Sequence, residues 1–213
     1  MKHQAARRAP SLFGLLLFFS LSITAGCGQS EVSGSVEPAT PTGPSTGERL
    51  LAEAPSGWKE VFTSNNPGLR MVEFIPEDQA NASWEHKITF ESLSGKPLPD
   101  PIEFLKGLSA DQSGTCDGFE SFSTFSDFEN GYPTTVRLMI CKHSDIINQS
   151  QVTMLKAIQG EENFYVITRA QRGPPLADDT PALTDEEVVG WTLYLKAISV
   201  CDDSAEHPCP QPG

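Results

Sequence analysis

Apolar and polar residues alternate in short runs from residue 69 onward. The run "LRMVEFIP" (69–76) is rich in β-branched and aromatic residues and stops at proline, and "HKITFESL" (86–93) places Ile88 and Phe90 on one face. Alternation with a period of two is typical of antiparallel strands with one covered face. We therefore predict strands over both runs, the second one half-buried.

Three further apolar runs follow closely on one another. "TTVRLMIC" (134–141) alternates, "QVTMLKAI" (151–158) alternates except that Lys156 interrupts its apolar face, and "NFYVITRA" (163–170) is apolar on both faces at its start. The last pattern suits a central strand covered on each side. "QGEEN" (159–163) is predicted to join the second and third runs as a hairpin turn.

Two segments carry signals for helix starts. In "DPIEFLKGL", Asp100 is a plausible N-cap, Pro101 occupies the first helical position, and Glu103 can complete a capping box. The same capping signal occurs in "LTDEEVVGWTLYLKAISV", with Thr184 as the N-cap and Glu187 three residues later. The predicted buried stripes are Ile102, Leu105 and Leu108 in the first helix, and Val188, Trp191, Leu195 and Ile198 in the second.

The order of strands, helix, four strands and helix predicts the fold class. It indicates an α+β domain over residues 56–202, an antiparallel β-sheet flanked by helices. Residues 203–213 form a polar C-terminal tail.

Residues 1–26 have the graded composition of a secretory signal peptide, with a basic start and an apolar run too short to span a membrane. Its end, "TAGC", resembles the lipobox of bacterial lipoproteins: Thr24, Ala25 and Gly26 match the positions before the cut, and Cys27 matches the lipidated residue. Gly28, where an aspartate would resemble an inner-membrane retention signal, favours the outer membrane, facing the periplasm. The alternative is an ordinary signal peptide that leaves Cys27 as a thiol.

Residues 27–55 are predicted to be a flexible tether behind the lipidated cysteine, because the segment is rich in Gly, Ser, Thr and Pro and nearly free of large apolar residues. An ordered first strand here has little apolar support.

The net charge limits the partners. It is −13, and cleavage before Cys27 would remove three cations and make it −16. Such a surface repels phosphate backbones and anionic head groups, so we expect no nucleic acid partner and membrane attachment through acyl chains alone.

Without Cys27, the chain keeps four cysteines, which allow three pairings. If "ENGYP" turns the chain at Asn130, Cys116 and Cys141 lie near the open end of one hairpin, and a bridge is feasible. A bridge between Cys201 and Cys209 would tie the tail to the end of the second helix. The rival interpretation is a metal site of Cys201, His207 and Cys209, but an oxidising compartment favours the disulfides.

Phenylalanine recurs at every third position in "GFESFSTFSDFEN", at Phe119, Phe122, Phe125 and Phe128. A period of three sends alternate members to opposite faces of a strand. We therefore expect a strand buried on both sides. The functional alternative is an aromatic strip for a partner or an apolar ligand, which a contiguous exposed patch would support.

Catalytic signals are weak. His86 and His143 could each act as a base, and Asp145 follows His143 by two residues, but no nucleophile elbow, phosphate-binding loop or zinc-protease motif occurs. We expect no catalytic set, no metal and no cofactor.

The run "MVEFIPEDQANASWEHKITFESL" (71–93) is similar to bacterial lipoproteins of the PsbP-like and Ran-binding Mog-like sandwich group. The resemblance lies in Glu73, Phe74, Pro76 and Trp84 and in the strand from Ile88. It implies an αβα sandwich that binds other proteins or stabilises assemblies, with no shared catalytic set.

The leading hypothesis is therefore a non-enzymatic outer-membrane lipoprotein whose disulfide-stapled domain is a binding or assembly module, with an unidentified envelope protein as its partner. One alternative is a periplasmic enzyme or metal-binding protein that uses His86, His143 or the C-terminal tail. Another is an inhibitor or immunity-type protein that blocks a basic envelope protein.

Overall fold

The computed structural model describes residues 47–202 and 204–210. The strands are β1 (Arg49–Leu51), β2 (Trp58–Asn66), β3 (Leu69–Pro76), β4 (His86–Ser94), β5 (Cys116–Glu129), β6 (Tyr132–Ser144), β7 (Gln149–Gln159), β8 (Asn163–Gly173) and β9 (Ser199–Cys201). The helices are α1 (Pro101–Ser113) and α2 (Asp185–Ala197), and a short 3-10 helix, η1 (Asn81–Ser83), precedes β4.

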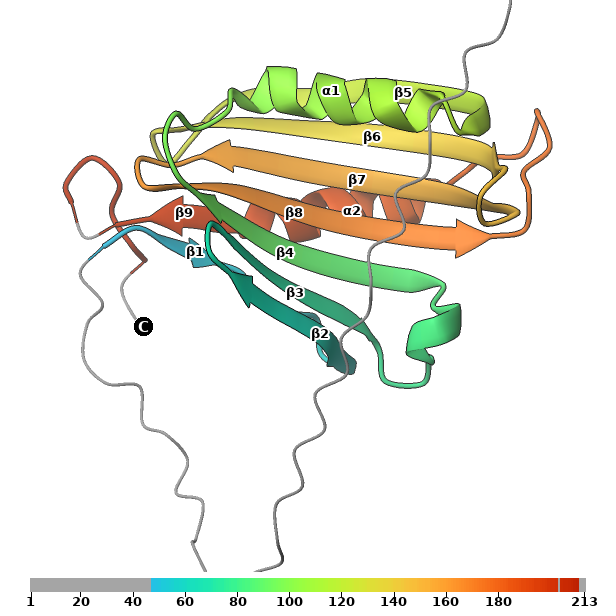
Figure 1. Ribbon diagram of the computed structural model, residues 1–213, viewed down its shortest axis with the longest axis horizontal. Helices are drawn as coiled ribbons and strands as arrows, with labels where there is room; N and C mark the ends of the chain where they lie inside the picture. Colours follow the sequence, from blue (N-terminus) through green and yellow to red (C-terminus); the bar gives the residue numbers. More distant parts are fainter. Residues whose placement is uncertain (1–46, 203, 211–213) are drawn as a thin grey trace, which may run out of the picture. The chain divides into compact units, whose positions relative to one another are not determined.

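Seven of these strands form one antiparallel sheet in the order β2-β3-β4-β8-β7-β6-β5, and β1 pairs with β9 in a small second sheet (Figure 1). The sequence prediction of an α+β fold with an antiparallel sheet is confirmed. β8 is central and covered on both faces, as predicted. β4 is a paired inner strand in which both Ile88 and Thr89 are buried, so it is more deeply covered than its alternating pattern predicted.

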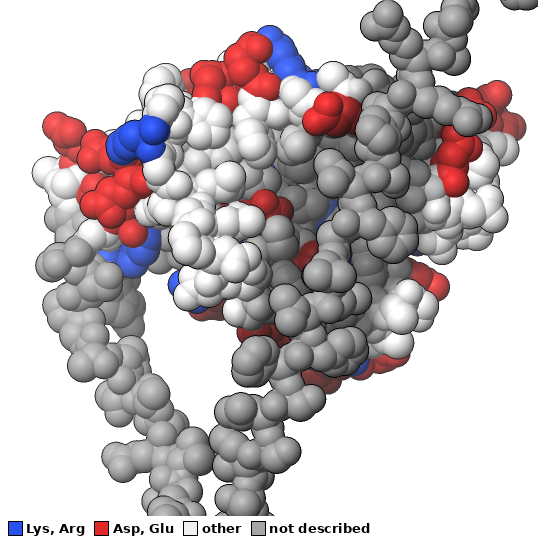
Figure 2. Space-filling model, viewed as in Figure 1, with Lys and Arg blue, Asp and Glu red and all other residues white. Residues whose placement is uncertain are grey.

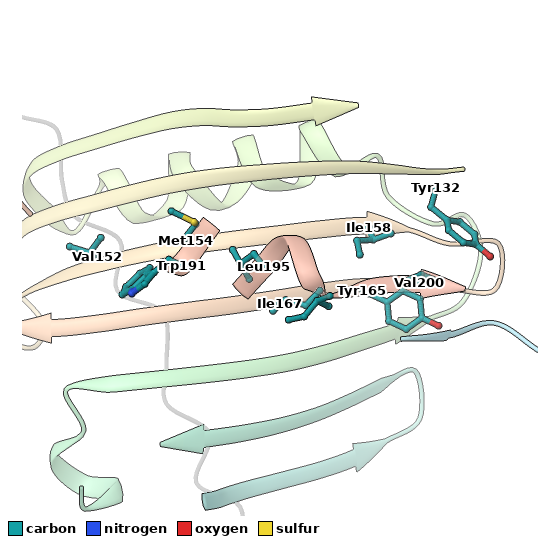
Figure 3. Packing of buried hydrophobic residues seen from close by; sticks show 10 residues of the cluster. Tyr132, Val152, Met154, Ile158, Tyr165, Ile167, Trp191, Leu195 and Val200 are labelled. Carbon is teal, nitrogen blue, oxygen red and sulfur yellow. The ribbon is translucent and has the colours of Figure 1, made fainter. Parts of the chain in front are cut away.

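The two helices cover opposite faces of the sheet. Leu105 of α1 packs with Leu155 of β7, whereas Trp191 and Leu195 of α2 pack with Met154 of the same strand (Figure 3). Since Met154 and Leu155 are adjacent and point to opposite faces, the arrangement is the predicted αβα sandwich. The largest of the three buried hydrophobic clusters lies under α2 and is made by Tyr132, Val152, Met154, Ile158, Tyr165, Ile167, Trp191, Leu195, Ile198 and Val200.

Both helices begin where the capping residues predict. The Asp100 side chain accepts a hydrogen bond from the Glu103 amide at 3.0 Å, and Thr184 and Glu187 form a complete capping box. The box at α1 is incomplete, because the Glu103 carboxylate accepts from Lys106 at 2.8 Å instead.

The apolar stripe of α1 is displaced from the predicted one, because Phe104 packs against the core in place of Ile102. Leu105 is fully buried and Leu108 is half-buried, but Ile102 is exposed. In α2, Trp191 and Leu195 are buried, as is Ile198 just after the helix, and Val188 is half-buried. α1 therefore reaches the sheet through its first and middle turns, where Pro101 is also buried, whereas α2 reaches it through its middle and C-terminal turns.

Part of the predicted tether is an ordered strand. Strand β1 lies inside the range 27–55, where we predicted only flexible chain. Leu50 pairs with Val200 of β9 and packs against the main core. The carboxylate of Glu48 accepts hydrogen bonds from the backbone amides of residues 161–163 in the turn between β7 and β8. Backbone pairing with a distant strand supplies the order that local apolar content did not indicate.

Candidate functional site: an exposed aromatic edge strand

Strand β5 is the last strand of the large sheet, and no strand among the described residues pairs with its outer edge. Phe122, Phe125 and Phe128 are 48%, 36% and 66% exposed, and only Phe119 packs against the α1 core. The expectation of a strand buried on both sides is therefore wrong. The pattern of apolar residues does not encode whether a strand lies at the centre or at the edge of a sheet.

The four phenylalanines divide between the two faces of β5. Phe122 and Phe125 lie opposite Leu138 and Val136 of β6, on the side of α2. A bulge between Ser123 and Phe125 keeps both on that side although they are three residues apart. Phe119 and Phe128 lie on the opposite face, the side of α1.

The strand also carries four carboxylates and no lysine or arginine. Glu120 pairs with Lys142 at 3.2 Å, and Glu129 pairs with Lys156. Asp127 accepts a hydrogen bond from the Phe128 amide at 2.9 Å. Acidic side chains also gather at several places around the face drawn in Figure 2, with few basic ones among them.

The cysteines pair as predicted. Cys116 and Cys141 form a disulfide across β5 and β6, with their Cα atoms 5.6 Å apart. Asn130 and Gly131 both have positive φ, as the two-residue turn of this hairpin requires. Cys201 and Cys209 form the second disulfide, which closes the C-terminal loop. The first bond fixes the start of β5 to its neighbour.

The second disulfide removes the thiolates that the metal hypothesis requires. His207 instead stacks on Tyr132 at 4.1 Å, and its Nδ1 lies 2.8 Å from the carbonyl oxygen of Asn130. No group of three His, Cys, Asp or Glu residues in the described part of the chain is arranged to hold a metal ion.

The two candidate histidine bases lie apart. His86 is at the start of β4, and His143 is near the end of β6, with β8 and β7 between those strands. The Nε2 atom of His143 lies 3.0 Å from the side-chain oxygen of Asn148, so its polar neighbour is not Asp145. The structure does not bring these residues together into one site.

One buried charge was not interpreted from the sequence. Lys156 is fully buried and donates to the carbonyl oxygens of Leu195 and Ile198 at 2.9 and 2.7 Å, and to the Glu129 carboxylate. Burial lowers the pKa of Lys156, and Glu129 opposes this effect. The lysine satisfies the C-terminal carbonyls of α2 and connects β5 to the core. The signal for this buried charge in the sequence was a lysine within an otherwise apolar strand face.

The lipidation candidate, Cys27, and the signal peptide at 1–26 lie outside the described residues, so both stay predictions. Among the helices that the structure describes, none is long and apolar enough to cross a membrane.

Comparison with known proteins gives only distant similarities. No family model matches the chain, and no curated protein matches it. The solved structures similar to it include two that each share 11% sequence identity with it. LpqN from Mycobacterium tuberculosis, described as involved in cell envelope biogenesis, has a TM-score of 0.43 over 75% of this chain and 87% of its own.

The second is the Ran-binding protein Mog1p from Saccharomyces cerevisiae, with a TM-score of 0.39 over 72% of this chain and 92% of its own. The weak Mog-like resemblance noted in the sequence is thus found in the structure as well. The PsbP-like part of that resemblance stays a prediction.

Proposed function

We propose that this protein is a non-enzymatic binding module, exported and anchored in the outer membrane through a lipidated Cys27, and that β5 is its partner-binding surface. The anchor is supported by the signal-like composition of residues 1–26 and by the "TAGC" sequence at its end. Two disulfides suit an oxidising compartment such as the periplasm.

The observation that carries the binding role is the exposed aromatic edge. Unprotected edge strands pair readily with other chains, and exposed apolar patches mark interaction sites. β5 combines an open edge with three exposed phenylalanines, over a strand that a disulfide and a buried ion pair hold in place.

The partner is an extended basic segment of another envelope protein that adds to β5 as a further strand. In this mode, backbone hydrogen bonds supply affinity and alternate side chains supply specificity. The carboxylates of β5 and the net charge of −13 favour lysine and arginine in the partner. A second copy of β5 would bring like charges together, which disfavours self-pairing.

A defined peptide tests this surface. We expect the full chain to bind a peptide of about ten residues that alternates aromatic and lysine residues, a length typical of strands. Fluorescence anisotropy should show weaker binding at high salt and none for the same peptide with glutamate in place of lysine. N-methylation of alternate peptide amides should abolish binding, because it removes strand hydrogen bonds.

The double variant Phe122→Ser/Phe125→Ser should weaken binding by at least about tenfold. Its control is Leu193→Ser, which removes an apolar side chain of α2 that is more exposed, at 62%, than either phenylalanine. Equal affinity of both variants for the basic peptide would refute the assignment of β5.

The anchor is tested separately by intact-mass analysis of the protein expressed with its own signal in a Gram-negative host. We expect a chain that starts at Cys27 with acyl chains and has no thiol available for alkylation. A soluble product that starts at another residue would refute the lipidation proposal.

A further inference from the structure

A cavity of about 390 Å³ lies between β1 and the sheet, on the face that α2 covers. Arg70, Val72, Phe90 and Tyr165 come from β3, β4 and β8 and share that face by their register, and Leu50 of β1 lies across from them. The volume is within the range of small-molecule sites, about 300–1,000 Å³. The cavity is separate from β5, which lies at the far edge of the sheet (Figure 1).

The cavity has an apolar wall. Val72 and Phe90 are adjacent across the β3–β4 pair, and Leu50 and Ala52 close the other side. Tyr165 is buried at its base. These groups can hold a small hydrocarbon or aromatic body out of water.

The charges around the cavity favour an anion. Arg70 is exposed, and among the described residues it is the one arginine whose side chain has no hydrogen bond, ion pair or ring contact. Glu48 also lines the cavity, but its carboxylate is occupied by the backbone amides of residues 161–163. Arg70 therefore offers a guanidinium to a bound anion, in a chain of net charge −13.

Glu91 does not neutralise Arg70. By register its side chain is on the opposite face of the sheet, beside Glu73. Burial raises the pKa of Glu91, with Glu73 adding to this effect and Lys87 opposing it. The part of Glu91 that lines the cavity is therefore its backbone.

We propose that this cavity binds a small amphipathic carboxylate, with its apolar body against Val72, Phe90 and Leu50 and its carboxylate on the guanidinium of Arg70. Guanidinium groups bind carboxylates through two parallel hydrogen bonds, which gives both affinity and orientation.

Calorimetric titration of the full chain with octanoate and with octanol tests the proposal. Octanoate is expected to bind at one site at least about tenfold more tightly than octanol. Arg70→Gln should remove that difference and leave octanol binding unchanged. The control Lys106→Gln removes a charge from α1, on the other face of the sheet, and should change neither affinity.

Ser92→Phe locates the site, because Ser92 lies on the cavity wall between Arg70 and Tyr165 and the larger side chain fills the space. It should abolish binding of both probes while the thermal midpoint and far-UV spectrum stay those of the folded protein. The proposal is overturned if octanoate does not bind, if octanol binds equally well, or if Arg70→Gln or Ser92→Phe keeps the native octanoate affinity.

Discussion

The two edge strands of the seven-stranded sheet, β2 and β5, differ in the side chains that they expose to solvent. β2 is nine residues long and mostly polar, with Phe62 as its exposed large apolar side chain and Lys59 donating to the carbonyl of Glu77. β5 is fourteen residues long, has three exposed phenylalanines and contains no lysine or arginine. Both strands contain a bulge, so the bulge is not what separates them.

The contrast indicates which edge is available for binding. Charged side chains on an edge strand, lysine above all, are a common means of preventing unwanted pairing, and β2 carries Lys59 and is shorter than β5. β5 has no lysine and is instead fixed from within, by Cys116–Cys141 at one end and by the Glu129–Lys156 pair at the other. A rigid and apolar edge is suited to strand addition, because little ordering is needed on binding.

The largest effect on stability is expected from the Lys156–Glu129 pair, which holds the end of β5 against the core. Lys156→Ala leaves Glu129 and two helix carbonyls without their buried partner, and we expect a loss of about 3–5 kcal/mol in the free energy of unfolding. Lys59→Ala on β2 should cost less than about 0.5 kcal/mol. Urea denaturation measures both, and similar losses would contradict the contrast between the edges.

The second-largest effect on stability is expected from the Cys116–Cys141 disulfide. The double variant Cys116→Ser/Cys141→Ser is expected to lower the free energy of unfolding by about 3 kcal/mol. Hydrogen exchange should become faster at the amides of β5 and stay unchanged at those of β2. Uniform acceleration across the sheet would show that the bond stabilises the whole domain rather than this edge.

A smaller and pH-dependent effect is expected at Glu91 of β4, which β3 separates from β2. Burial raises the pKa of this carboxyl, so folding favours its protonated form. The stabilisation is present below the ordinary pKa and is lost as the pH rises through the raised one. Glu91→Gln should therefore raise stability at neutral pH by at most about 1 kcal/mol and flatten the acid limb of the stability profile.

The smallest effect on stability should come from making β5 resemble β2. Phe122→Lys adds a charge at an exposed position, and the free energy of unfolding should change by less than about 0.5 kcal/mol. Binding of the basic peptide should nevertheless be lost, through lost apolar contact and added repulsion. Phe62→Lys on β2 is the matched control, and a loss of binding there would move the site away from β5.

Local sequence was a good guide to the elements. Asp100 and Thr184 marked the starts of both helices, and the alternating runs marked the strands from β3 to β8, except that β5 was found through its phenylalanines. The turn at Asn130 and Gly131 led to the correct cysteine pair. These features depend on residues that are close in the chain, and the geometry of a cap or a tight turn restricts which residues can form it.

The order of the strands in the sheet could not be obtained from local sequence. The sequence by itself determined the α+β class, the helix starts, the disulfide pairs and the acidic surface. Only the tertiary structure decided that β5 is an edge, that Lys156 lies under the end of α2, and that β1 joins β9 across about 150 residues. The reason is that periodicity records which face of a strand is apolar, whereas exposure depends on which strands lie on either side.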